Sequence, residues 1–480
     1  MAASFFFYDL ETTGINPREG RIMQFAGQRT DMDLKYVGEP VNILVKLTPD
    51  ILPEPDAIMV TGITPQATLA DGISEAEFIK IFQNDVATPD TIFIGFNTVR
   101  FDDEFMRFTL YRNFTDPYTW QWKDGRSRWD LLDLVRMTRA LRPEGIEWPF
   151  APDGKPTVRL ELLTKANGLD HEKAHDALND VYASIAVADL VKANQPKLFE
   201  FLLKMRNKKE VEKLVTTEKA FVYTSGKYAN EYEKTTVVTA LAKHSKKQGM
   251  VVYDLRYDPS EYLGMTVQEL VDRMAWVKDR ESSAARLPVK TLQYNRCPAI
   301  APLGVLDATA QKRLQVDLAT IEENRKKLEG AEEFKKNVLA ALDLNDSKRQ
   351  VEWANDDQDV DSQIYNGFFD DSDARLLPVV CAAAPEELMG LQDDLHDKRL
   401  KALLPLYKAR NYSSSLTAEE RVVWDEFCKQ RLFGGEANSR FARFALRLEE
   451  LGASKLTQNQ KFALEELRLY AESIMPAELI

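Results

Sequence analysis

The chain has 480 residues, of which 63 are Lys or Arg and 76 are Asp or Glu, so its formal net charge is −13. At roughly 150 residues per domain, this length predicts about three domains and excludes a peptide hormone or a lone binding module. The net negative charge excludes a surface that is basic all over, so any groove that binds phosphates must be a local basic patch.

The cysteine pattern and the lengths of the apolar runs indicate the cellular compartment of the protein. Cys297, Cys381 and Cys428 are far apart in the sequence and form no C-x-x-C pair, which favours a reducing compartment. The apolar start is too short for a signal segment, and no run approaches the roughly 18 to 20 apolar residues that span a bilayer. We therefore expect a cytoplasmic protein that does not contact membranes.

The first 195 residues combine strand and helix patterns. Apolar runs predict strands, and apolar residues at three- and four-residue steps predict helices. In chain order the expected elements are strands at 5–8, 21–30 and 41–47, a helix at 75–82, a strand at 91–96, and helices at 102–114 and 177–192. Three strands followed by helices predict a layered α/β unit with an antiparallel start.

The rest of the chain changes character near residue 200. Short β-rich runs at 221–224, 235–239 and 250–255 predict a small β-rich domain, and 312–342 has helical spacing. Residues 352–373 contain eight acidic residues and no basic one, so we expect a linker or loop there. The segments 376–380, 418–432 and 439–470 predict a mainly helical end, and the expected domains are 1–195, 196–350 and 351–480.

Asp9 and Glu11 end the first apolar strand in a D-x-E pattern. Alternate strand residues face the same side, so the two carboxylates lie close together on a rigid backbone. Such a pair is costly without a cation, and oxygen ligands of this kind suit Mg²⁺ or Mn²⁺. By itself a D-x-E pair is more often two solvated acids at an exposed strand end.

A second acidic site follows the strand at 91–96, where Asp102 and Asp103 come just before a helix. Carboxyl edges of sheets are common places for active sites in open α/β folds. Either residue could instead be a helix N-cap, and their spacing alone does not separate them.

The third element, His175-Asp176-Ala177-Leu178-Asn179-Asp180, opens the last helix of the first unit. His175 and Asp180 would lie about 140° apart on a helix. We therefore expect His175 in the preceding loop and Asp180 on the first turn. Asp176 shares a face with Asp180 and is an alternative ligand or the N-cap.

The order of these three elements resembles the histidine-bearing branch of the DEDD exonuclease superfamily. Further runs are similar to bacterial exonuclease I over most of the chain: GITPQ at 62–66, NTVRFDDE at 97–104, YRNF at 111–114, SRWDLLDL at 127–134, LRPEGI at 141–146, LTKANG at 163–168 and YNGFF at 365–369. The resemblance implies a ribonuclease H-like mixed-sheet exonuclease domain, then a small SH3-like β-rich domain, then a mainly helical C-terminal domain.

The resemblance also implies roles for five residues. Asp9, Glu11, Asp102 and Asp180 would hold two Mg²⁺ ions, for which Mn²⁺ can substitute, and His175 would be the general base. The choice of Asp102 over Asp103 rests on the resemblance.

Single-strand binding needs aromatic surfaces and phosphate-binding cations, and the segment 107–136 is rich in both. At this density any one of these aromatic residues is equally explained as part of the core. The residues that we expect to contact DNA are Arg107, Tyr118, Trp122 and Arg136, with Arg159 at a phosphate, Thr12 and Glu11 at the terminal nucleotide, and Lys208 in the second domain.

The family's domains close a groove around one strand, which implies processive action on single-stranded DNA and exclusion of duplex. The resemblance further implies a partner, the acidic C-terminal tail of the single-stranded DNA-binding protein. Arg142 in LRPEGI is a candidate contact for that tail, although a turn explains an Arg before Pro equally well. We expect the enzyme to be a monomer.

The leading hypothesis is a 3′→5′ exodeoxyribonuclease that degrades single-stranded DNA to 5′-mononucleotides in repair and recombination. A 3′→5′ exoribonuclease shares the catalytic pattern, but the roughly 280 residues beyond a lone exonuclease unit favour capture of a long strand. A noncatalytic single-strand-binding or recruitment protein is the alternative from another class, and His175 favours catalysis over it.

Overall fold

The computed structural model describes residues 3–169, 176–274, 286–356, 359–435 and 438–475. The chain divides into two compact units. The first comprises 1–127, 171–182 and 357–480, and the second comprises 128–170 and 183–356. Within the described ranges, no helix is both long enough and apolar enough to cross a bilayer.

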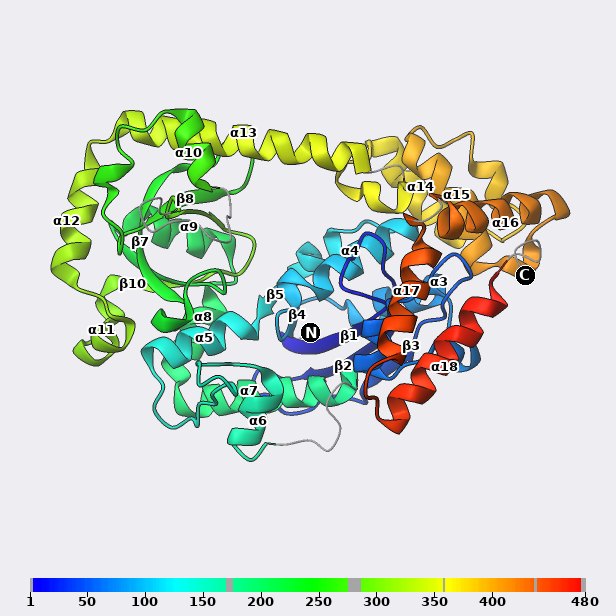
Figure 1. The fold of residues 1–480 in the computed structure, drawn as a ribbon, viewed down its shortest axis with the longest axis horizontal. Helices are drawn as coiled ribbons and strands as arrows, with labels where there is room; N and C mark the ends of the chain where they lie inside the picture. Colours follow the sequence, from blue (N-terminus) through cyan, green and yellow to red (C-terminus); the bar gives the residue numbers. More distant parts are fainter. Residues whose placement is uncertain (1–2, 170–175, 275–285, 357–358, 436–437, 476–480) are drawn as a thin grey trace. The chain divides into compact units, whose positions relative to one another are not determined.

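A mixed five-stranded sheet is built around the N-terminal strand (Figure 1). Its order is β3-β2-β1-β4-β5, and the strands are β1 (Ser4–Thr12), β2 (Ile22–Thr30), β3 (Val41–Leu44), β4 (Thr91–Gly95) and β5 (Ser127–Asp130). β1 pairs antiparallel with β2 and parallel with β4. The mixed α/β fold and the antiparallel start are therefore confirmed.

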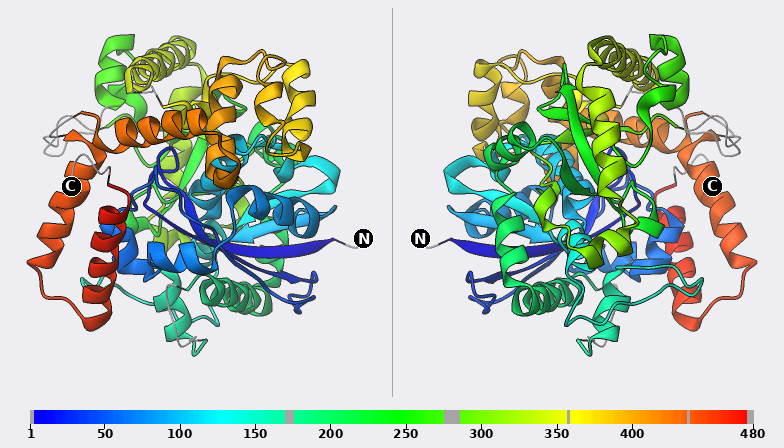
Figure 2. Two further views of the ribbon diagram at one scale, coloured as in Figure 1. Left: turned by 90° about the vertical axis from the view of Figure 1, so that its right-hand side faces the viewer. Right: turned by 90° about the vertical axis from the view of Figure 1, so that its left-hand side faces the viewer.

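The two faces of β1, dark blue in Figure 2, have different neighbours. Phe6, Tyr8 and Leu10 face an aromatic core. The helices that complete this core are α3 (Glu75–Ile81), the π-turn Phe82–Val86 and α4 (Asp102–Arg112). Because side chains alternate along a strand, Asp9 and Glu11 face the other side. The core thus fixes the backbone that carries the two acids.

The C-terminal helices share hydrophobic cores with the N-terminal segment. Phe444 and Leu467 pack with Ile51 and Ile58 in one cluster, and Leu403 packs in a second cluster with residues of α4. The helices in this unit besides α3 and α4 are α1 (Pro55–Thr61), α2 (Pro65–Asp71), α14 (Asp371–Ala382), α15 (Lys398–Asn411), α16 (Ala418–Phe433), α17 (Arg440–Gly452) and α18 (Gln458–Ser473). The C-terminal helices therefore belong to the same compact unit as strands β1 to β4.

The second unit contains an antiparallel sheet in the order β10-β6-β7-β8-β9. Its strands are β6 (Phe221–Thr224), β7 (Thr235–Lys243), β8 (Gly249–Asp254), β9 (Val289–Gln293) and β10 (Ala299–Pro302). Its helices are α5 (Leu131–Leu141), α6 (Leu160–Ala166), α8 (Pro196–Lys204), α9 (Lys208–Thr217), α10 (Val267–Met274), α11 (Ala308–Leu314), α12 (Leu318–Glu329) and α13 (Glu332–Asp356), while α7 (Ala177–Asn194) begins in the first unit. The expected β-rich domain is present.

The acidic stretch at 352–373 is not the linker or loop that we expected. α13 extends to Asp356, a 3₁₀ segment covers Val360–Tyr365, and α14 begins at Asp371. Asp361 is fully buried and pairs with Arg21 at 2.6 Å, with Arg410 at 2.8 Å and with Arg431 at 3.1 Å. The prediction failed because these partners are distant in sequence. The composition of the stretch alone is that of a solvated acidic loop.

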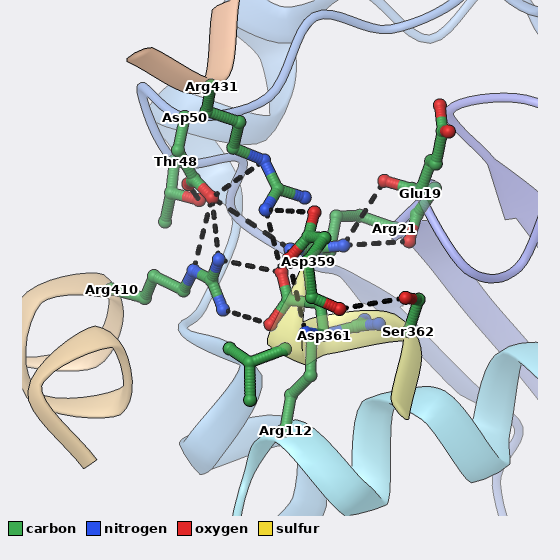
Figure 3. A network of polar contacts seen from close by, with 12 residues as sticks. Glu19, Arg21, Thr48, Asp50, Arg112, Asp359, Asp361, Ser362, Arg410 and Arg431 are labelled. Carbon is green, nitrogen blue, oxygen red and sulfur yellow. Dashed lines mark hydrogen bonds and ion pairs between the residues drawn. The ribbon is translucent and has the colours of Figure 1, made fainter. Parts of the chain in front are cut away.

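Asp50 joins the same network (Figure 3). It lies 2.8 Å from Arg410 and 3.6 Å from Arg431, and it is also fully buried. Burial alone would raise its pKa, but the surrounding guanidinium groups outweigh burial and lower the pKa of Asp50 to about 2. The pKa of Asp361 is likewise held well below its usual range. This network joins the N-terminal segment to the C-terminal helices.

We predict that Asp50 stabilises the fold at neutral pH and loses this effect in acid. A carboxylate with a lowered folded pKa contributes its stability above its unfolded pKa of about 3.9, and that stability disappears as pH falls toward the folded pKa. For a folded pKa of about 2, the contribution is roughly 2 to 3 kcal/mol at pH 7. Urea unfolding at pH 7 should show Asp50→Asn clearly less stable than the parent, and the gap should narrow at pH 3.

Asp56→Asn is the matched control, because Asp56 pairs with Arg447 at 2.8 Å on the exposed surface. Such exposed pairs contribute at most about 1 kcal/mol. A loss of stability for Asp50→Asn that is no larger than that for Asp56→Asn would contradict the structural role of the network.

Candidate active site

Three carboxylates meet at the end of β1. Asp9 and Glu11 project from the strand on its side away from the aromatic core, and Asp180 comes from the first turn of α7. Each offers an oxygen, and these oxygens all lie within 4.8 Å of one another. The structure thus brings together two of the three acidic elements singled out in the sequence.

Asp102, from the second acidic site of the sequence analysis, is the first residue of α4. The parallel ladder between β1 and β4 ends at Phe7, so the next part of β1 lacks a strand neighbour on that side. There the backbone N–H of Leu10 donates to Oδ1 of Asp102 at 3.1 Å. Asp103 instead accepts a hydrogen bond from the Tyr8 hydroxyl at 2.6 Å. The two adjacent acids therefore have different surroundings, which spacing could not show.

The electrostatics of the cluster support the same grouping. Burial raises the pKa of Asp9 well above its usual range, and Asp102, Glu11 and Asp180 add to the effect in that order. Burial also raises the pKa of Glu11 to about 8, with further contributions from Asp180 and then Asp102. Each carboxylate makes the ionised form of its neighbours less favourable.

This donor set fits divalent cations. Asp9 and Glu11 form no ion pair with Lys or Arg in the described parts of the chain. Mutually repelling carboxylates that lack a basic partner are typical of sites for hard cations, which prefer oxygen ligands. The cluster can therefore hold a divalent cation beside Asp9 and Glu11.

The structure describes Asp176 but not His175. The Asp176 carboxylate accepts from the backbone N–H of Leu178 at 3.1 Å, in the manner of an N-cap of α7. Asp176 is also close enough to raise the pKa of Glu11. His175, the expected base, lies outside the described residues.

The expected DNA-contact residues of the first unit differ in exposure. Trp122 is 63% exposed, whereas Arg107 is buried and bonds Glu104 at 2.7 Å and Gln121 at 2.8 Å. The Arg107 guanidinium also lies 5.9 Å from the ring centre of Tyr118. Thr12 is buried, and its hydroxyl donates to the carbonyl of Gly14.

The other expected contacts belong to the second unit. Arg136 pairs with Asp133 on α5 at 2.7 Å, and the exposed Arg159 pairs with Glu161 at 3.2 Å. Lys208 is exposed at the first position of α9. The expected partner contact, Arg142, is partly exposed and lies 3.3 Å from Asp307. These residues remain predictions as contacts.

Sequence reasoning did not single out Phe368, although it belongs to the YNGFF run. Phe368 is 87% exposed and its ring lies edge-on to Tyr118 at 5.9 Å. Gly367 precedes it with a φ of 139°, which side chains other than glycine rarely allow. Arg399 holds the loop by donating to the carbonyls of Gln363 and Gly367, both at 3.0 Å. The exposed aromatic ring is thus presented by an anchored loop.

The fold and the carboxylate cluster define a class, the exonucleases. Residues 6–188 match the family model described as "Exonuclease". This class depends on divalent metals, in agreement with the donor set. Residues 206–344 match "Exonuclease I SH3-like domain", and residues 358–474 match "Exonuclease I C-terminal domain".

Known relatives narrow the class. The chain is 41% identical to exodeoxyribonuclease I of Haemophilus influenzae, covering 89% of this chain and 90% of the relative, and 38% identical to that of Escherichia coli, covering 98% of both. A solved exonuclease I from Methylocaldum szegediense superposes with a TM-score of 0.92 at 40% identity, over 99% of this chain and 100% of that one. The E. coli exonuclease I in complex with a dA16 oligonucleotide gives 0.90 at 37% identity, over 98% and 100%. The chain belongs to the exodeoxyribonuclease I family, and the expected fold class is confirmed.

We predict that Glu11→Gln has opposite effects with and without metal. In EDTA the variant should melt at a higher temperature than the parent, because one of the repelling carboxylates is removed. With Mn²⁺ it should gain less in melting temperature, since the bound ion loses a charged ligand. Calorimetric titration should show Mn²⁺ affinity lowered about tenfold or more, by analogy with the 10- to 100-fold effects of changes around metal sites.

Glu39→Gln serves as the control because Glu39 is exposed and outside the cluster. It should behave as the parent in both buffers. Equal Mn²⁺ binding by the Glu11 and Glu39 variants would show that the ion does not use the cluster.

Proposed function

We propose that the chain is a 3′→5′ exodeoxyribonuclease that hydrolyses single-stranded DNA to 5′-mononucleotides. The observation that carries this proposal is the group of four carboxylates from β1, α4 and α7 in a chain of the exodeoxyribonuclease I family. A place in DNA repair and recombination follows from that activity.

The catalytic roles are divided among five residues. Asp9, Glu11, Asp102 and Asp180 would hold two Mg²⁺ ions, and Mn²⁺ can substitute for them. When bound, these ions supply Lewis-acid stabilisation of the charge that develops on the phosphate oxygens. His175 accepts a proton from the attacking water, a role that suits neutral imidazole near physiological pH.

Substrate binding uses the neighbouring aromatic and basic residues. Thr12 and Glu11 adjoin the terminal nucleotide, and Arg159 contacts a phosphate near the cleaved bond. Trp122, Tyr118 and Phe368 offer ring faces for stacking, which tolerates any base sequence. The exposure of Trp122 and Phe368 and the anchored 365–369 loop support this assignment. Further phosphate contacts are assigned to Arg107, Arg136 and Lys208.

The domain boundaries and partner remain part of the proposal. We assign the exonuclease domain to 1–195, the SH3-like domain to 196–350 and the helical domain to 351–480. The proposed activity is processive and excludes duplex. A monomeric cytoplasmic enzyme is expected to bind the acidic tail of the single-stranded DNA-binding protein through Arg142. One relative has been solved as SSB/exonuclease I in complex with an inhibitor, which supports that partner.

The alternative functions are less well supported. Relatives solved with dA16 and dT13 oligonucleotides favour DNA over RNA as substrate. A noncatalytic strand-binding role leaves the cluster of carboxylates without a purpose beyond a structural cation.

The activity is tested with matched 5′-labelled DNA and RNA oligonucleotides in Mg²⁺. We expect the DNA to shorten from its 3′ end and the RNA to persist, and EDTA to stop the reaction. His175→Ala should still bind single-stranded DNA but hydrolyse it at least about 100-fold more slowly, in the range of general-base effects. Preference for RNA would reverse the assignment, and undiminished turnover by His175→Ala would remove it as the base.

We predict that Trp122→Ala and Phe368→Ala each weaken single-strand binding without unfolding the protein. Stacking on an aromatic side chain contributes about 1 to 3 kcal/mol per base, so affinity should fall about 5- to 150-fold. Fluorescence anisotropy with a labelled oligonucleotide measures the loss. Phe462→Ala, which removes another exposed aromatic ring on α18, is the control and should bind as the parent does. If the melting temperature of either variant falls so far that unfolding explains its weaker binding, that ring has a structural role instead.

A further inference from the structure

The Tyr8 hydroxyl donates to Oδ1 of Asp103 at 2.6 Å, and both residues are buried. Neither belongs to the group of four carboxylates. Tyr8 directly precedes Asp9, however, and Asp103 directly follows Asp102. This one hydrogen bond therefore joins the two chain segments that carry three of the four ligands, Asp9 and Glu11 on β1 and Asp102 on α4.

The bond lies on the opposite side of β1 from Asp9. Tyr8 faces the aromatic core, because alternate residues of a strand face opposite sides. Successive residues of a helix are about 100° apart, so Asp102 and Asp103 point in different directions from the first turn of α4. Fixing Asp103 against Tyr8 consequently fixes the rotation of that turn and the direction of Asp102.

The Tyr8 ring has little freedom to move. It stacks on Phe25 with ring centres 6.0 Å apart, and Phe93 and Trp120 lie edge-on to it at 6.3 and 6.5 Å. A ring held on several sides keeps its hydroxyl aimed at one place. The acceptor of its hydrogen bond is therefore fixed by the packing of the core.

The N-terminus of α4 lacks a side-chain N-cap from the residue that precedes it. Phe101 occupies the N-cap position and offers no side-chain hydrogen bond to the helix. Asp102 is itself held through the backbone of Leu10. The Tyr8–Asp103 bond thus adds a second attachment between β1 and the start of α4.

We infer that Tyr8 and Asp103 are positioning residues for the metal centre. They hold Asp102 at the distance from Asp9 that a bound cation requires. This inference rests on the proposed function, because it takes Asp9 and Asp102 as metal ligands. Removing groups that orient metal ligands lowers metal affinity or activity by about 10- to 100-fold.

The test is Tyr8→Phe, which removes only the hydroxyl. We expect Mn²⁺ affinity, measured by calorimetric titration, to fall about 10- to 100-fold. The rate of DNA hydrolysis at fixed Mn²⁺ should fall with it, and KM for the oligonucleotide should be unchanged. Saturating Mn²⁺ should restore much of the rate, because the ligands themselves remain.

Tyr470→Phe is the matched control. The Tyr470 hydroxyl is also in the interior and donates to the carbonyls of Thr48 and Ile51, both at 3.1 Å. Its loss should lower the melting temperature without changing Mn²⁺ affinity. If Tyr8→Phe loses melting temperature in the same way and binds Mn²⁺ as the parent does, the bond is structural only and the inference is overturned.

A second pair of variants covers the case in which Tyr8→Phe does not fold. Asp103→Asn keeps an oxygen acceptor for the Tyr8 hydroxyl, whereas Asp103→Leu does not. We expect the Asn variant to bind Mn²⁺ at least threefold more tightly than the Leu variant, and equal affinities would overturn the inference. Failure of the unmodified protein to bind Mn²⁺ would instead refute the proposed metal centre itself.

Discussion

Repulsion between clustered, partly buried carboxylates is the constraint on which the site depends. Asp9 and Glu11 are held on one face of β1, and Asp180 and Asp102 approach from two helices, so the ionised forms destabilise one another. An ordinary core would relieve this by moving a side chain into water. Here the acid-bearing part of β1 pairs with β2 and rests on an aromatic core, so its backbone is held in place.

The same unit contains a second group of acids, which is fully buried and is neutralised by arginine side chains. Asp50 and Asp361 are surrounded by Arg21, Arg410 and Arg431, and their pKa values fall below the usual range. Breaking such a buried pair is strongly destabilising because an uncompensated charge is left behind. The protein therefore supplies counter-charges where it needs cohesion. At the end of β1, Asp9 and Glu11 have no Lys or Arg partner among the described residues, and a bound cation can neutralise them instead.

Much of the site followed from local rules, and the remainder depended on distant contacts. The D-x-E spacing was sufficient to place Asp9 and Glu11 on one face, since strand periodicity is local. The separation of Asp102 from Asp103 was not accessible, because it depends on where β4 stops and on the Tyr8 hydroxyl. The network around Asp361 was also hidden, since its partner Arg21 is 340 residues away. The outward direction of Phe368 depends on the backbone of Gly367, which the aromatic run did not reveal.

The aromatic core under β1 serves both stability and geometry. Phe25, Phe93 and Trp120 would stabilise the sheet in any arrangement that buried them. Their edge-on and stacked contacts with Tyr8 also fix the orientation of its ring, and so they determine where its hydroxyl points. Through Asp103 that direction reaches the first turn of α4, and through the next residue it reaches the carboxylate cluster. Packing on one face of the strand is thereby coupled to ligand geometry on the other, since one backbone carries both.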